Sequence, residues 1–536
     1  MNMLIQAPTK WDLCRLYSNE QDLMFSIEQL KIEYKATKDP ATLSQLIQAI
    51  EKAEYYLYCR ATEDDTPPEN NLLSVTINQL KKEVQLLIES SRKQGINDDN
   101  SSIKLLENEL KAWEDMYIQL RNKIEVIHDK ETLSFGQANY LSMNSDDHNE
   151  RFKVFDSLTN ALNKEKEIFA TVLNQIGRLR YTKSVEMEGT TILKQSLQAN
   201  GISETVLTQM WNATEQNLTK LVSALNVYKK GKDSITWHEL MTLKESNETV
   251  IPFSEAVQNI YDALKNVDEE LAKFVWNAIA NGWVDAEPRD NKPSGGFCAP
   301  FFSEKESRIS MRYDGNIDSV RVLAHELGHA WHFYVMSLEQ STSFLDDYLP
   351  MSTAESASIF FEVVLVNHLI KTAENTEMKK ALLSWKIRNS FNYVMAIRAS
   401  FQFEKSFYEA CKESPINADE IEKLSIAAQE KAYGNALSEY QPFVWMKYVQ
   451  FYIADVPLYN YPYTFGYLVS FSLLEIMKEN KDEFHLRYKE FLRETGKAPV
   501  EELMKKHFDI DLTNYEFWNK AFIQIDKDID EYLQLI

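Results

Sequence analysis

The stretch His325-Glu326-Leu327-Gly328-His329 lies within a run of apolar and helix-forming residues, 320–336, which predicts one helix over residues 319–337. Residues four apart share a helix face, so the rings of His325 and His329 can reach one metal ion. Glu326 follows the first ring and can reach a water molecule at that metal. Two histidines and one further protein ligand leave a fourth zinc position open for water. The stretch therefore predicts a catalytic zinc site on a helix.

A short motif of this kind also arises by chance, although the chain holds only 9 histidines in 536 residues. The alternative interpretation is a helix with two half-buried histidines and no metal. A third ligand at a suitable distance in the sequence would favour the metal.

The third ligand is not a histidine of the same helix. Metzincins place that histidine after a glycine, but this chain has His332 and Val335 at the two positions, which excludes the class. His332 lies one turn too far from His325 to share its metal. We expect His332 to support the ligands or to pack in the core.

A glutamate on a following helix is the better candidate. Ser352-Thr353 is a capping signal, and apolar residues at helical spacing predict a helix over residues 352–371. Glu355 lies in its first turn, and we assign it as the third zinc ligand. Glu362 lies two turns further along in apolar company, where a carboxylate needs a partner. We expect it to accept the free N–H of a ligating ring.

Two alternatives to this assignment stay open. Either glutamate could be a solvated helix residue, because most glutamates are exposed. Asp346 and Asp347, in the loop before the second helix, are reserve ligands.

A small β element is expected before the motif, over residues 297–302 and 308–312, which are short and bounded by glycine, proline and polar residues. Such a strand beside the motif helix can bind an extended peptide by strand addition. Gly295 and Gly296 precede it and could approach a substrate closely. A plain loop is the alternative.

The rest of the chain predicts a mainly α fold. Glycine and proline number only 14 each, and segments rich in lysine, glutamate, leucine and glutamine are long. We expect long amphipathic helices over residues 20–121, with breaks at 64–68 and 95–100, and further helices over 149–179 and 203–228. A chain of 536 residues should form one or two large domains.

Charge and cysteine content limit the partners. A net charge of -23 argues against nucleic acid and anionic membranes, since both require a basic surface. The four cysteines are scattered and predict neither a disulfide framework nor a cysteine metal site. We expect no signal peptide in the first residues and no apolar run of the ~20 residues that span a bilayer. We therefore expect a cytoplasmic protein.

The chain resembles the oligoendopeptidase F–thimet oligopeptidase family of metallopeptidases, on its oligoendopeptidase F branch. The resemblance extends over nearly the whole chain. It is carried by residues 11–13, 16–17, 139–142, 283–289, 294–298, 325–332, 354–358 and 462–468.

The resemblance implies a zinc-dependent endopeptidase that hydrolyses internal bonds of short peptides by attack of a zinc-bound water. It implies one Zn²⁺ per chain, with ligands His325, His329 and Glu355 and with Glu326 as the base. The expected fold is a large helical zincin-like metallopeptidase with a deep substrate cleft and the small β element beside the motif helix. The expected domains are an N-terminal helical domain, 1–185, and a catalytic domain, 186–536.

The resemblance also implies that a tyrosine near the C-terminus polarises the scissile carbonyl. The Tyr-rich segment, 457–470, offers Tyr467 for that role, with Tyr459, Tyr461 and Tyr463 as substrate-binding residues. Aromatic clusters are also common in cores. The branch often has histidine where this chain has Gln450, so Gln450 would have to contact substrate as a neutral amide.

Other functions remain open at this stage. A helical zinc carboxypeptidase could share the ligand pattern. A catalytically silent peptide-binding module could share the scaffold. A purely structural zinc would need four protein ligands. The sequence sets no oligomeric state.

Overall fold

The structure is a computed structural model, and it describes residues 7–37, 39–64, 72–92, 100–229, 232–243, 250–289, 292, 295–338 and 349–536. The chain forms two compact units, each assembled from three separate segments. Unit 1 comprises Met1–Asp98, Asn247–Leu382 and Gly466–Asp511, and unit 2 comprises Asp99–Ser246, Leu383–Phe465 and Leu512–Ile536.

Unit 1 is helical, with one small sheet. Its helices are α1 (Glu20–Thr37), α2 (Pro40–Asp64), α3 (Leu72–Arg92), α10 (Phe253–Lys265), α11 (Glu269–Ala280), α12 (Ile317–Met336), α13 (Met351–Thr372), the first part of α14 (Thr376–Ser390), most of α18 (Tyr461–Glu479), α19 (Lys481–Arg493) and α20 (Val500–Phe508). Its strands are β3 (Val284–Asp285), β4 (Gly296–Phe301) and β5 (Glu306–Met311).

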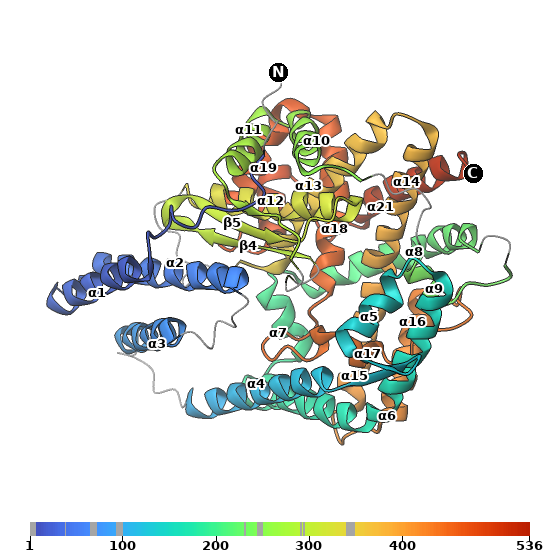
Figure 1. Ribbon diagram of the computed structural model, residues 1–536, viewed down its shortest axis with the longest axis horizontal. Helices are drawn as coiled ribbons and strands as arrows, with labels where there is room; N and C mark the ends of the chain where they lie inside the picture. The colour runs from blue at the N-terminus through green and yellow to red at the C-terminus, as the bar shows by residue number, and fades with distance from the viewer. Residues whose placement is uncertain are drawn as a thin grey trace. The chain divides into compact units, whose positions relative to one another are not determined.

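The sheet has the order β3-β5-β4, with β3 parallel and β4 antiparallel to β5. Cys298 on β4 is opposite Ile309 on β5, and Lys305, at φ 55°, closes the turn between these two strands. Helix α12 packs on β4 and β5, and α13 packs along α12 (Figure 1). The predicted β element beside the motif helix is therefore confirmed.

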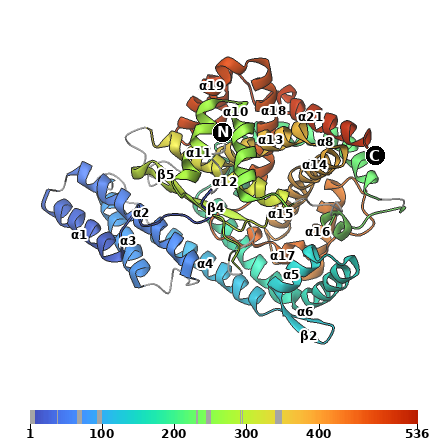
Figure 2. The same cartoon turned by 45° about the horizontal axis from the view of Figure 1, so that its top comes forward.

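The first residues of the chain join this sheet region. Asp12 donates its backbone N–H to the Gly282 carbonyl, and Ala286 donates to the Thr9 carbonyl. Apolar side chains of α1–α3 form a core with Trp11, Ala299 and Phe301. Figure 2 shows α1, α2 and α3 as neighbouring blue helices.

Within its described residues, unit 2 is helical apart from the β1–β2 hairpin. Its elements are α4 (Asn100–Asn122), β1 (Glu125–His128), β2 (Glu131–Ser134), α5 (Phe135–Asn144), α6 (His148–Tyr181), the π-helical turn η2 (Thr182–Met187), α7 (Ile192–Ala199), α8 (Glu204–Val227), α9 (Trp237–Met241), the π-helical turn η4 (Phe391–Ala396), α15 (Ile397–Ala410), α16 (Ala418–Ala432), α17 (Val444–Lys447), the 3-10 turn η5 (Val449–Phe451) and α21 (Tyr515–Leu533).

The mainly α fold class is confirmed, and several local expectations are corrected. The β1–β2 hairpin was not expected, because its strands are only four residues long and β1 shows no long apolar run. Asp129 and Lys130 form its turn with positive φ, which asparagine or glycine would have signalled more clearly. The chain also breaks between α1 and α2. The predicted breaks at 64–68 and 95–100 lie largely outside the described residues.

Helix α13 corrects a second expectation. By length and composition it is apolar enough to span a membrane, which corrects the expectation that no apolar run approaches that length. Most of its apolar window is buried inside the protein, at 78%, and it carries two glutamates there. These features are those of a core helix of a globular unit.

The predicted division into consecutive domains, 1–185 and 186–536, is a separate hypothesis. Its boundary falls inside unit 2, within η2. The units describe which segments contact each other and not which segments fold alone, so this division stays a prediction.

The deep substrate cleft expected from the sequence also stays a prediction.

Candidate metal centre and active site

Helix α12 carries the motif and begins where its sequence allows. The side chain of Asn316 caps it by accepting the Ser319 N–H at 2.8 Å. Gly328 lies between the two histidines, where a side chain would collide with α13. A Cβ atom there would be 2.7 Å from the Ser358 Cα and 3.0 Å from the Ala357 oxygen. Gly328 thus lets the backbones of α12 and α13 approach closely beside the two rings.

Helix α13 begins differently from the prediction. Its N-cap is Pro350, which has no side chain to accept a hydrogen bond, and Ser352 and Thr353 lie inside its first turn. The Thr353 hydroxyl donates back to the Pro350 carbonyl at 2.9 Å. The predicted cap was therefore wrong, while the predicted helix is present and holds Glu355 in its second turn.

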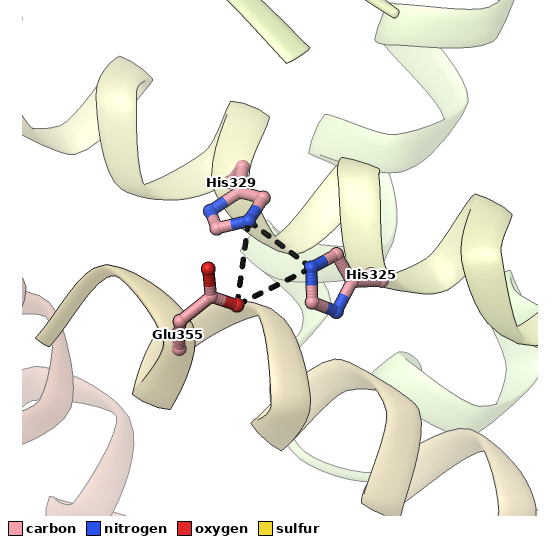
Figure 3. Close-up of side chains that lie close together, drawn as sticks. All are labelled: His325, His329 and Glu355. Carbon is pink, nitrogen blue, oxygen red and sulfur yellow. Dashed lines mark hydrogen bonds and ion pairs between the residues drawn. The ribbon is translucent and has the colours of Figure 1, made fainter. Parts of the chain in front are cut away.

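Three donor atoms converge between these helices (Figure 3). The Nε2 atoms of His325 and His329 are 3.2 Å apart, and Oε2 of Glu355 lies 3.4 Å from the first and 3.9 Å from the second. Tetrahedral zinc with bonds of about 2.0–2.1 Å places its ligand atoms about 3.3 Å apart. The three side chains therefore have the spacing and chemistry of a candidate metal ligand set.

Glu362 fixes the orientation of the first ring. Its Oε1 lies 2.5 Å from Nδ1 of His325, and its Oε2 accepts from Arg321 at 3.0 Å. Because a carboxylate only accepts, Nδ1 carries a proton, so Nε2 is the ring atom left to bind a metal. Burial alone would raise the pKa of Glu362, but Arg321 and His325 lower it below its usual range. The contact predicted for Glu362 is present.

Glu326 lies one residue after His325 and is 5% exposed. Burial is the main reason that its pKa rises to about 7, and the charges of Glu355 and Glu362 add to this. Burial lowers the pKa of His325, but the hydrogen bond and charge of Glu362 outweigh it and raise that pKa to about 9. For His329, burial and the neighbouring His325 lower the pKa well below its usual value.

Charge balance at the site also favours a cation. Three buried carboxylates, Glu326, Glu355 and Glu362, lie with one guanidinium, Arg321. If all three are ionised and His325 is neutral, as metal binding requires, the negative charges exceed the charge of Arg321 by two, and a divalent cation would balance them.

Arg321 is a site residue that the sequence analysis missed. It lies four residues before His325, on the same helix face, and this spacing could have identified it. Its pairing with Glu362 links the start of α12 to the carboxylate that holds His325.

His332 does not join the donor atoms. It is fully buried, and its Nε2 lies 2.6 Å from the hydroxyl of Thr495. That hydroxyl donates its own hydrogen to the Leu492 carbonyl at 2.7 Å, so His332 donates to Thr495. His332 therefore ties α12 to the end of α19.

Several other predicted site residues belong to unit 1. Gly295, at φ 107°, precedes β4, Gly296 is the first residue of β4, and both are exposed. Tyr467 is buried on α18 in unit 1, with its ring centroid 4.7 Å from that of Phe471. Asp346 and Asp347, the reserve ligands, lie outside the described residues.

The other predicted substrate-binding residues belong to unit 2. The hydroxyls of Tyr459 and Tyr463 are 3.2 Å apart, and Tyr461 donates to the Ser196 carbonyl at 3.1 Å. Gln450 is half-buried in η5. Their predicted substrate contacts stay predictions.

A second group of potential ligands occurs in unit 2, around the β1–β2 turn. His128 Nε2 lies 2.8 Å from Glu150 and 3.8 Å from Asp129, which is highly exposed. The shorter distance is an ordinary hydrogen bond, and Nδ1 is near the Ser157 hydroxyl at 3.3 Å. A hydrogen-bonded histidine explains this group without a metal.

Comparison with known proteins decides the family. The model of peptidase family M3 matches residues 141–523, which include both helices of the candidate metal centre.

The chain belongs to peptidase family M3.

Family M3 relatives match over most of their length. An oligoendopeptidase F homolog of Borreliella burgdorferi is 23% identical over 97% of this chain and 96% of its own. The oligopeptidase PepF of Bacillus subtilis is 23% identical over 91% of this chain and 70% of its own. The predicted family and the prediction of a peptide-hydrolysing enzyme are confirmed.

Solved structures share the fold. A crystal structure from Chlamydophila abortus, of a protein assigned as a peptidase, has a TM-score of 0.80 at 20% identity and covers 99% of both chains. The oligoendopeptidase F of Enterococcus faecium has a TM-score of 0.64 at 16% identity over 98% of this chain and 97% of its own.

The burial of His332 predicts a pH-dependent stability. Burial lowers the pKa of His332 to about 4, whereas an unfolded histidine titrates near 6.5. The stabilisation is fully present above pH 6.5 and is lost as the pH falls from 6.5 to 4, on the order of 3 kcal/mol in all. We expect His332→Gln to reduce the fall in thermal midpoint between pH 7 and pH 4.5.

His485→Gln is the control, because His485 is a partly exposed histidine of the same unit. An unchanged pH dependence in His332→Gln would contradict the assignment of His332 as a buried neutral ring.

Proposed function

We propose that this M3 peptidase is a zinc-dependent endopeptidase that hydrolyses internal bonds of short peptides. The observation that carries the proposal is the convergence of the His325, His329 and Glu355 donor atoms beside the buried carboxylate of Glu326. The relatives named oligoendopeptidase F and oligopeptidase support endopeptidase action on oligopeptides.

Zinc suits the proposed ligands, one ion per chain. Two imidazoles and a carboxylate are a catalytic zinc set, and the donor distances agree with tetrahedral coordination. Glu362 and Arg321 would hold His325 in the tautomer that binds metal. The side chains of His325 and His329 remain 16% and 15% exposed, so solvent reaches them.

Bound zinc would acidify a water ligand and polarise the scissile carbonyl. Glu326 is the proposed general base. Burial raises the pKa of its carboxyl above that of an exposed glutamate, which makes it a stronger base that can take a proton from the attacking water and later deliver it to the leaving amine. No covalent intermediate is needed, because water itself attacks the carbonyl.

The substrate contacts are also part of the proposal. Tyr467 would donate its phenol hydrogen to the oxyanion that develops on the carbonyl. Gly295, Gly296, Tyr459, Tyr461, Tyr463 and Gln450 are the proposed substrate-binding residues. Strand β4 is an edge strand of the described sheet, so it could pair with an extended peptide.

We further propose a cytoplasmic location. The four cysteines, Cys14, Cys59, Cys298 and Cys411, are all free thiols, as a reducing compartment favours. The net charge of -23 supports peptides rather than nucleic acid or anionic membranes as partners.

One prediction tests Glu326 as the general base. Glu326→Gln should keep zinc but lose at least about a hundredfold in kcat, since the amide cannot accept the proton. His329→Ala should lose both zinc and activity. Metal content and peptide cleavage are measured on the same samples, with Glu269→Gln, an exposed glutamate on α11, as the control. Full cleavage by Glu326→Gln would remove the base assignment.

The second prediction concerns the reaction. Peptides blocked at both ends, in a series of increasing length, should be cut internally, and a chelator should stop the cleavage. Cut sites are identified by mass. Cleavage that requires a free C-terminus and removes one residue at a time would instead support a zinc carboxypeptidase. Binding without any cleavage would support a silent peptide-binding module.

A further inference from the structure

Gly466 lies against the backbone that carries Glu355. It is buried on α18, and a Cβ atom there would be 3.0 Å from the Glu355 carbonyl carbon, 3.0 Å from the Ser356 nitrogen and 3.2 Å from the Glu355 Cβ. One turn further along α18, the Ser470 hydroxyl donates to the Gly466 carbonyl at 2.7 Å and also lies 3.0 Å from the Ser356 carbonyl on α13. Helix α18 therefore presses on α13 at the turn that holds Glu355.

Gly296 has the same relation to Glu326. A Cβ atom at Gly296 would be 2.9 Å from Glu326 Oε1, 3.0 Å from its Cγ and 3.1 Å from the Ser310 carbonyl oxygen on β5. Glu326 is 5% exposed, so its carboxylate has little free space into which it could move.

Backbone conformation does not require glycine at either position. Neither residue has a positive φ. Glycine inside a helix is less favourable than alanine, and glycine inside a strand weakens the strand. The close approach of a neighbouring element is therefore the physical reason for a missing side chain at both positions.

We propose that Gly466 and Gly296 are positioning residues for the active site. Gly466 lets α18 pack closely on the backbone of Glu355. This contact holds the Glu355 carboxylate beside the ring nitrogens of His325 and His329. Gly296 leaves the space that the carboxylate of Glu326 occupies beside β4. This inference rests on the proposed function, because it assigns the two glycines to zinc binding and to proton transfer respectively.

The two glycines should therefore fail in different ways. In Gly466→Ala, the new methyl group must push the Glu355 backbone by a few tenths of an ångström, which disturbs one ligand of three. We expect zinc to bind about 10- to 100-fold more weakly, as for other disturbed ligand supports. In Gly296→Ala, zinc affinity should stay at the wild-type value. Its kcat should fall about a hundredfold, since the base is displaced.

The experiment uses the purified full-length chain. Zinc affinity is measured by competition with a chromophoric chelator, and the visible spectrum of the Co²⁺-substituted protein reports ligand geometry independently of activity. Gly136→Ala, on α5 in unit 2, is the matched control, because a Cβ atom there meets nothing within 4 Å. Circular dichroism and the thermal midpoint show which variants are folded.

A second variant covers the case in which Gly466→Ala does not fold. Ser470→Ala adds no volume and removes the hydroxyl contact between α18 and Ser356. We expect about two- to fivefold weaker zinc binding from the loss of one such contact. Wild-type affinity in folded Ser470→Ala would then overturn the assignment of Gly466.

The outcomes separate this inference from the proposed function. A folded Gly466→Ala with wild-type zinc affinity and cobalt spectrum overturns the role of Gly466. A folded Gly296→Ala with wild-type kcat, or with weakened zinc binding equal to that of Gly466→Ala, overturns the role of Gly296. A wild-type chain that binds no zinc and resists chelators overturns the proposed function, and the two assignments with it.

Discussion

The close contact between α12 and α13 is the constraint on which the candidate site depends. A histidine pair one turn apart offers two ligands from one helix, but the third donor, Glu355, comes from another helix across a loop. Gly328 has no side chain, so the backbone of α13 can pack directly against the backbone of α12. The ligand set is therefore a property of helix packing as much as of the motif.

Burial gives the site its electrostatic character. Carboxylates in a protein interior are unfavourable unless they are paired, and Glu362 is paired with both Arg321 and His325. Glu326 has a different environment, in which burial and two neighbouring carboxylates raise its pKa to about 7. The same helix pair thus keeps Glu362 ionised beside His325 and gives Glu326 a pKa close to neutral pH, which suits a group that carries a proton.

The motif and helical periodicity together predicted which of these residues lie close to one another. Helical spacing indicated that His325 and His329 share a face, and the apolar surroundings of Glu362 predicted its need for a partner. The placement of Glu355 beside the rings also agrees with the prediction. The β element before the motif was found because its strands are bounded by glycine and polar residues.

Features that depend on tertiary contact were not predictable in this way. Helix α13 begins after Pro350, which forms no side-chain cap, and the short β1–β2 hairpin carries a weak local signal. The roles inferred for Gly466 and Gly296 depend on which element lies against them, which spacing along the chain does not reveal. Arg321 could have been predicted from the sequence, because it lies one helical turn before His325.

The most direct test of the account is a crystal structure of the zinc-loaded protein with anomalous diffraction data collected on both sides of the zinc edge. The account predicts one strong anomalous peak per chain, bonded to Nε2 of His325, Nε2 of His329 and a carboxylate oxygen of Glu355, with a water or substrate oxygen completing the shell. A peak elsewhere, or a Glu355 side chain turned away from the two rings, would contradict it.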